Sequence, residues 1–126
     1  MTIQLVNEYG KVMMNSEVIS TLAGAAALDC YGLVGMASRS QLKDGITELL
    51  GRDNLSKGVE IRQEDSQENG QENEVHIDLY IIVSYGTKIS EVAHNIQNKV
   101  KYVLNDLIGL EVHTVNIYVQ GVRVSQ

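Results

Sequence analysis

The sequence contains no tryptophan, phenylalanine or proline, and Cys30 is its single cysteine. Without phenylalanine and tryptophan, a core has to be built from leucine, isoleucine, valine and methionine, with tyrosine at its margins. One cysteine cannot form an internal disulfide, which favours a reducing compartment. The longest nearly apolar run, residues 22–28, is far shorter than a membrane span. The first residues lack the basic and apolar regions of a secretory signal, so we expect a cytoplasmic protein without direct membrane insertion.

Acidic charge is abundant but unevenly spread. The 126 residues carry a formal net charge of −6. Residues 64–74 contribute five acidic side chains and no basic one, so the rest of the chain is nearly neutral. This segment also has no apolar residue, and we expect it to form a flexible loop of a hairpin. Basic residues elsewhere are interspersed with acidic ones instead of forming a stripe, so no nucleic acid is expected as a partner.

The centre of the chain changes its hydrophobic period from two residues to about 3.6. Apolar side chains occupy every second position from Val75 to Val83, which predicts a strand with one apolar face. A turn is predicted at residues 84–88. From Ile89 to Leu107 the apolar residues form one stripe of an amphipathic helix, and Gly109 follows the predicted helix end. A strand and a helix joined in this way are expected to pack against each other.

Shorter patterns flank this unit. They predict strands at residues 2–6, 11–14, 33–37 and 114–120, and another strand that begins at Val59. A helix is predicted from residue 15 or 16 to about 31, with Gly32 at its C-terminal end. A short amphipathic helix is predicted over 42–50, ending at Gly51. Gly24 interrupts the alanines of the first helix, which we attribute to close packing. The order favours a single α+β domain over residues 1–126. We expect a two-layer sandwich in which a mostly antiparallel (mixed) sheet carries two long helices on one face and a short extra helix.

Residues with reactive side chains do not form a catalytic pattern. Cys30 follows a predicted helix end and is adjacent to Asp29; both features disfavour the thiolate, so we interpret the cysteine as structural. The three histidines, His76, His94 and His113, have no metal-binding spacing. His94 should be exposed, while His76 and His113 should point to opposite faces. We therefore expect no metal site, no cofactor and no enzymatic activity.

The turn Tyr85-Gly86-Thr87-Lys88 has two interpretations. Backbone N–H groups at the start of the following helix can hold an anion such as phosphate. Gly86 is equally required for a strand-to-helix turn with a positive φ, and Thr87 or Ser90 would then cap the helix. The structural turn is the favoured interpretation.

The central strand also predicts a second, outer face. If its odd-numbered residues face the helices, Tyr80 and Ile82 face away from them. Asn116 and Tyr118 join that face if the last strand is a neighbour. Tyrosines, an apolar residue and an amide are typical of a protein-recognition patch. An ordinary solvated sheet face is an equally good interpretation at this point.

The strand, turn and helix also carry a resemblance to a known family. Residues 81–93 read IIVSYGTKISEVA and continue as HNIQNKV over 94–100. Residues 15–19 (NSEVI), 29–37 (DCYGLVGMA) and the closing strand in 110–119 agree with the same pattern. The chain thus resembles the alkaline-shock and general-stress protein family of Gram-positive bacteria, in its YloU-like branch. The acidic segment 64–74 is longer than the family pattern, so no role is inherited there.

The resemblance implies a non-enzymatic cytoplasmic protein linked to cell-envelope stress. Some members are held at the membrane by a separate anchor protein, and some are encoded beside a kinase related to dihydroxyacetone and fatty-acid kinases. We therefore expect an interaction or scaffold module that forms a homo-oligomer or docks on a membrane-anchored protein partner. The alternative is a small-molecule or lipid-handling accessory to a neighbouring kinase-type enzyme, using the turn at residues 85–88.

Overall fold

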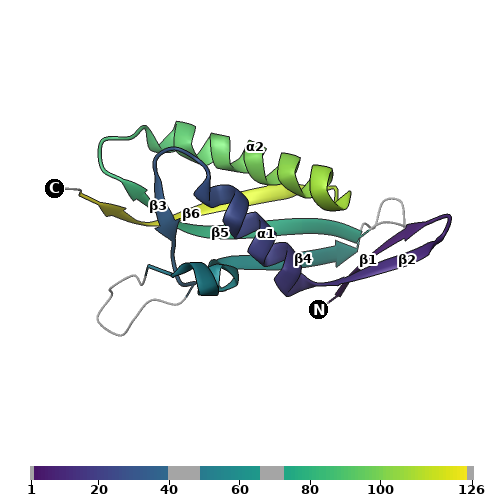
Figure 1. Ribbon diagram of the computed structural model, residues 1–126. Helices are drawn as coiled ribbons and strands as arrows, with labels where there is room; N and C mark the ends of the chain where they lie inside the picture. Colours follow the sequence, from purple (N-terminus) through teal and green to yellow (C-terminus); the bar gives the residue numbers. More distant parts are fainter. Residues whose placement is uncertain (1, 40–48, 66–72, 125–126) are drawn as a thin grey trace.

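The computed structural model describes residues 2–39, 49–65 and 73–124 of the chain (Figure 1). Strands β1 (Thr2–Asn7) and β2 (Gly10–Asn15) are followed by helix α1 (Ser16–Leu28) and strand β3 (Leu33–Met36). A 3-10 helix, η1 (Arg52–Gly58), leads into strands β4 (Val59–Asp65) and β5 (Asn73–Ser84). Helix α2 (Ile89–Ile108) and strand β6 (Thr114–Arg123) complete the order.

Strand β5 is the centre of a four-stranded mixed sheet. It pairs antiparallel with β4 along its first half and with β3 along its second half, and parallel with β6 on its other edge. Strands β1 and β2 form a separate two-stranded sheet, which projects from one end of the domain (Figure 1). The α+β class and the mixed sheet predicted from the sequence are confirmed.

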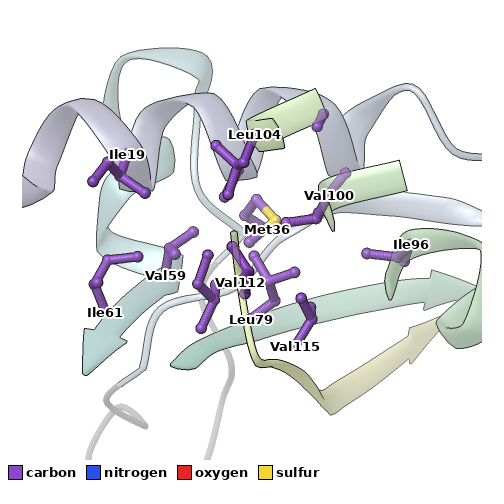
Figure 2. Packing of buried hydrophobic residues seen from close by; sticks show 14 of the residues in the cluster. Ile19, Met36, Val59, Ile61, Leu79, Ile96, Val100, Leu104, Val112 and Val115 are labelled. Atoms are coloured by element: carbon purple, nitrogen blue, oxygen red, sulfur yellow. The ribbon is translucent and has the colours of Figure 1, made fainter. Parts of the chain in front are cut away.

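Both long helices cover the same face of this sheet, and the core lies between the two layers. The odd-numbered residues Ile77, Leu79, Ile81 and Val83 of β5 are fully buried. Ile19 of α1 and Ile96, Val100 and Leu104 of α2 belong to the same cluster, which Figure 2 shows from close by. The predicted period-two strand and its packing against the following helix are therefore confirmed. Because all these side chains are aliphatic, the core forms without phenylalanine or tryptophan.

Helix α1 approaches its neighbours closely, as the alanine-rich sequence predicts. Asn15 caps the helix, its side-chain oxygen accepting from the Glu17 N–H at 2.9 Å. A Cβ added at Gly24 would lie 3.1 Å from the Cβ of Leu55 in η1. Gly24 thus allows a close contact between α1 and η1, a 3-10 helix that the sequence patterns do not predict.

The C-terminal end of α1 differs from the prediction. The helix ends at Leu28 with Asp29 as its cap, three residues before the predicted end at Tyr31. Gly32 does not terminate the helix but lies in the turn before β3, with a φ of +90°. A Cβ at Gly32 would lie 2.6 Å from Cγ2 of Val92, so this glycine lets the turn pack against α2.

Two further predictions fall partly outside the described residues. The predicted short helix at 42–50 lies mostly there, but its last residues are not helical: Leu49 forms a β-bridge with Ala37, and the Leu50 N–H donates to the Met36 carbonyl. Both ends of the predicted loop at 64–74 are strand instead, because the β4–β5 ladder extends to the pair Asp65–Asn73. Backbone pairing thus continues into the acidic segment, and its residues 66–72 lie outside the described residues.

Helix α2 buries the middle of its predicted stripe but not the ends. Val92, Ile96, Val100 and Leu104 are buried, whereas Ile89 and Leu107 are 40% and 60% exposed. The central turns of the helix therefore carry the packing against the sheet.

Truncating the middle of this stripe should destabilise the domain. We expect Ile96→Ala or Val100→Ala to lower the free energy of unfolding by about 2–4 kcal/mol, through lost burial and a cavity. His94→Ala, on the exposed side of the same helix, should change it by less than about 0.5 kcal/mol. Urea unfolding of the three variants measures these changes in the free energy of unfolding. A lower midpoint for His94→Ala than for the other two variants would contradict the assignment of Ile96 and Val100 to the buried side of the helix.

Candidate functional site

The candidate site is the sheet face that points away from the helices, which we call the outer face. It consists of the even-numbered side chains that the strand registers place side by side on β4, β5 and β6: Glu60, Arg62, Glu64, Glu74, His76, Asp78, Tyr80, Thr114, Asn116 and Tyr118. The registers place Asp78 between Glu60 and Asn116, and Tyr80 beside Tyr118. The condition under which Asn116 and Tyr118 join this face is met, because β6 is the neighbour of β5.

Asp78 is the centre of a hydrogen-bond network on the outer face. It is only 4% exposed, although it is charged and lies on the side of the sheet without helices. The Arg62 guanidinium donates two hydrogen bonds to its carboxylate, from Nε at 2.9 Å and Nη2 at 3.2 Å. Asn116 donates a third from Nδ2 at 2.9 Å. A bidentate arginine and an amide together satisfy a carboxylate that burial would otherwise make unfavourable.

The network keeps Asp78 ionised. Burial by itself would raise the pKa of this carboxyl, but the hydrogen bonds from Arg62 and Asn116 and the positive charge of Arg62 outweigh it, so the pKa is lowered. The same hydrogen bond and the charge of Asp78 raise the pKa of Arg62. The outer face therefore carries a fixed ion pair near neutral pH.

Two stacked tyrosines extend the outer face beyond this ion pair. The rings of Tyr80 and Tyr118 have centroids 4.9 Å apart and planes inclined by 14°. Tyr118 is 44% exposed. Burial, followed by the negative charges of Glu60 and Asp78, raises the pKa of the Tyr80 hydroxyl. The pair is thus a neutral aromatic surface with polar tips.

Ile82 differs from the prediction. It lies on β5 beyond the tyrosines, but it is only 4% exposed, so it does not supply an open apolar centre. Its neighbour across the sheet is Gly35, over which the Leu49 side chain lies: a Cβ at Gly35 would be 2.7 Å from Cδ1 of Leu49. The β-bulge that shifts the β5–β6 register between Ile81 and Ile82 was also not predictable from alternation alone. Tyr80, Tyr118 and Asn116 remain as the candidates on the outer face.

The turn before α2 has the predicted geometry at Gly86, whose φ is +92°. The predicted capping is wrong. Lys88 is the N-cap residue and, within the described part of the chain, makes no side-chain cap hydrogen bond. The Thr87 hydroxyl instead donates to the Ser84 carbonyl at 2.7 Å and closes the turn, while Tyr85 is 71% exposed. Lys88 forms an ion pair with Glu91 at 3.6 Å, and this carboxylate opposes a bound anion.

The histidines are distributed differently from the prediction. His94 is exposed, as expected, and bonds to Asn98. His76 and His113 were expected on opposite faces, but their ring centroids lie 6.1 Å apart. The reason is that His113 precedes β6 instead of belonging to it, and its backbone N–H donates to the Val75 carbonyl. His76 contacts Glu64 and Glu74, a grouping that histidine spacing alone does not reveal.

Cys30 is half-buried just beyond α1, with Sγ 3.9 Å from the Ala26 carbonyl oxygen. Burial is the largest influence and raises the pKa of the thiol; Asp29 adds to the rise and Lys99 opposes it. A raised pKa disfavours the nucleophilic thiolate. The structural interpretation of this cysteine is supported.

Removing the charge of Asp78 should destabilise the domain. We expect Asp78→Asn to lower the free energy of unfolding by about 1–2 kcal/mol near neutral pH, because Arg62 loses its ionised acceptor while remaining partly hydrated. The folded-state pKa is lowered, so the unfolded chain binds the proton more tightly. The contribution of ionised Asp78 to the free energy of unfolding is therefore fully present above its ordinary pKa of 3.8. It is lost as the pH falls through the lower pKa of the folded state.

Chemical denaturation of wild type and Asp78→Asn between about pH 7 and pH 2.5 measures both effects. Glu60→Gln is the matched control, since its ion pair with Arg39 at 3.4 Å is open to water on both sides. If the difference in the free energy of unfolding between wild type and Asp78→Asn stays constant down to the lowest pH, Asp78 is not ionised in the folded protein.

Comparison with known proteins relates the whole domain to one family. Residues 4–124 match the family of alkaline-shock protein 23, described by a cell envelope-related function. The chain is 60% identical to the uncharacterized protein YloU of Bacillus subtilis over 125 residues, covering 99% of this chain and 98% of that protein. It is 39% identical to the uncharacterized protein Spy1614 of Streptococcus pyogenes over 124 residues, covering 98% and 97%. No solved structure matches. The resemblance carried by residues 81–100 is thus confirmed, and the chain belongs to the alkaline-shock protein 23 family, whose function is related to the cell envelope.

Proposed function

We propose that this protein is a non-enzymatic interaction module of the cell envelope, which uses the outer face to bind a second copy or a membrane-anchored protein. The observation that carries the proposal is the stacked pair Tyr80–Tyr118, held beside the buried carboxylate of Asp78. The cell envelope-related function of the family supports the setting.

The tyrosine pair has the physical properties of a protein contact. Tyrosine offers a large rigid surface with a polar tip, and it loses little conformational freedom on binding. Stacking restricts the rings before any partner arrives. Beside them, Arg62 donates two hydrogen bonds to Asp78, yet its side chain is still 38% exposed. Aromatic residues and arginine are the side chains most enriched at the energetic centres of protein interfaces.

The reactive groups of the described residues support a non-enzymatic role. The Cys30 thiol has a raised pKa, and Asp78 is held ionised by three hydrogen bonds from Arg62 and Asn116. Neither group is poised to accept or release a proton near neutral pH. In the described ranges no helix is long and apolar enough to cross a membrane. A peripheral, cytoplasmic position at the membrane would then depend on a protein partner.

Replacing both tyrosines should weaken association and leave the fold intact. We expect Tyr80→Ser with Tyr118→Ser to lower self-association and the recovery of partners from cell extract by at least about tenfold, since each lost aromatic anchor is worth about 1–2 kcal/mol or more. Neither residue belongs to the helix-facing core. Sedimentation velocity of the purified variant and affinity recovery from detergent-treated extract measure the two forms of association.

The matched control is Tyr31→Ser with Tyr102→Ser, because these tyrosines are 88% and 68% exposed and lie outside the outer face. This control should associate like wild type. Ile82 is left unchanged because it is buried, and a serine there would disturb folding. If the Tyr80/Tyr118 variant associates like wild type, the outer face is not the binding surface. The turn at residues 85–88, which the alternative of a small-molecule or lipid-handling accessory protein would use, then becomes the candidate.

A further inference from the structure

We propose that Glu64, Glu74 and His76 form a binding site for one divalent transition-metal ion of the Zn²⁺ type. The site lies on the outer face near the end of the β4–β5 hairpin. It was not expected from the sequence, where only the spacing of the histidines was considered. Three observations carry the proposal: the distances between the ligand atoms, a buried imidazole nitrogen without a hydrogen bond, and two carboxylates placed directly opposite each other.

The distances suit ligands of one ion. One ligand atom from each of the three side chains lies within 4.8 Å of the others. Nε2 of His76 is 3.4 Å from Oε2 of Glu74 and 3.7 Å from Oε2 of Glu64. Nitrogen and oxygen ligands bonded tetrahedrally to one ion at about 2.0–2.2 Å are separated by about 3.3–3.6 Å. The side chains therefore need to move little to enclose an ion.

The imidazole of His76 is oriented toward the two carboxylates with an unsatisfied nitrogen. The side chain is 12% exposed. Nε2 itself is buried and has no hydrogen-bond partner among the described residues. The other ring nitrogen, Nδ1, lies 2.7 Å from Oγ1 of Thr114. If Nδ1 carries the proton and donates to Thr114, Nε2 presents its lone pair to the carboxylates, an arrangement that a cation would relieve. A hydrogen bond donated by the second ring nitrogen fixes the tautomer and the ring orientation of a metal-binding histidine.

The charges of the two carboxylates also favour a cation between them. Glu64 and Glu74 are direct neighbours across the β4–β5 ladder, and like charges in this position destabilise a sheet. Arg62 offsets part of the repulsion through Nη1, which is 3.3 Å from Oε1 of Glu64. However, its Nε and Nη2 are committed to Asp78. Oε2 of Glu64 lies 3.7 Å from Nε2 of His76, so the two carboxylates next to the imidazole retain negative charge for an ion.

The donor set selects the class of ion. One imidazole nitrogen and two carboxylate oxygens suit Zn²⁺ and related transition metals, whereas Mg²⁺ and Ca²⁺ prefer oxygen ligands alone. Three protein ligands leave one tetrahedral position for water. An ion here would connect β4 to β5 and neutralise the acidic end of the outer face.

The test is a titration of the full-length, chelator-treated protein with Zn²⁺, followed by calorimetry and by thermal unfolding. We expect one ion per chain and a higher Tm with Zn²⁺. Glu74→Gln and His76→Gln should each weaken Zn²⁺ binding at least about tenfold, and Thr114→Val about tenfold or more. Without metal, Glu74→Gln should be at least as stable as wild type, because it removes the cross-strand repulsion.

His94→Gln is the matched control, since His94 is exposed on α2, bonds to Asn98 and is not one of the three proposed ligands. It should bind Zn²⁺ like wild type. Circular dichroism of each variant without metal verifies that it is folded. The absence of Zn²⁺ binding by wild type would overturn the site. Equal affinity in wild type and Glu74→Gln, or loss of binding in His94→Gln, would overturn it as well.

Discussion

Strand β5 has to satisfy two different environments at once. Its odd-numbered side chains, from Ile77 to Val83, are fully buried beneath both helices. On its other face Asp78 and Ile82 are each 4% exposed, although α1 and α2 both lie on the opposite side. It is also hydrogen-bonded to neighbours on both edges. Because side chains alternate strictly along a strand, a slip by one residue would expose the core and bury the charges.

The buried carboxylate of Asp78 makes this register more specific than hydrophobic burial alone. In the observed register Arg62 and Asn116 both reach Asp78, one from β4 and one from β6. In a shifted register the carboxylate would lose its donors, and an unpaired buried charge is far more costly than a suboptimal apolar contact. The network therefore ties three strands to one alignment. Because the Arg62 side chain is 38% exposed, the stability gained from the ion pair itself is limited.

Local patterns predict the elements whose folding is local. The period-two strand at 75–83, the turn with Gly86 and the amphipathic helix that follows are all present, because each depends on residues close in sequence. The same alternation correctly places Tyr80, Asn116 and Tyr118 on the outer face. Ile82 shows the limit: alternation gives its face, but not its burial, since its neighbours across the sheet, Gly35 and Gly121, come from other segments.

The contacts that sequence reasoning missed are those formed by pairing between strands. Arg62 and Asp78 are 16 positions apart, and Asn116 is 38 positions from Asp78. The register of the β4–β5 hairpin could not be read from a segment without apolar residues, so the approach of Glu64 to Glu74 stayed hidden. An alternation rule gives one face per residue, whereas a site requires the register of every neighbouring strand.

The outer face differs from an ordinary solvated sheet in how its side chains are held. On a solvated face, long polar side chains extend separately into water and retain their rotamer freedom. Here His76 bonds to Thr114, Asp78 bonds to Arg62 and Asn116, and Tyr80 stacks on Tyr118. Each of these contacts links β5 to a neighbouring strand, so ordering has already occurred in the free domain. A partner that binds this surface would have little side-chain entropy left to remove, which favours a specific contact over a merely adhesive one.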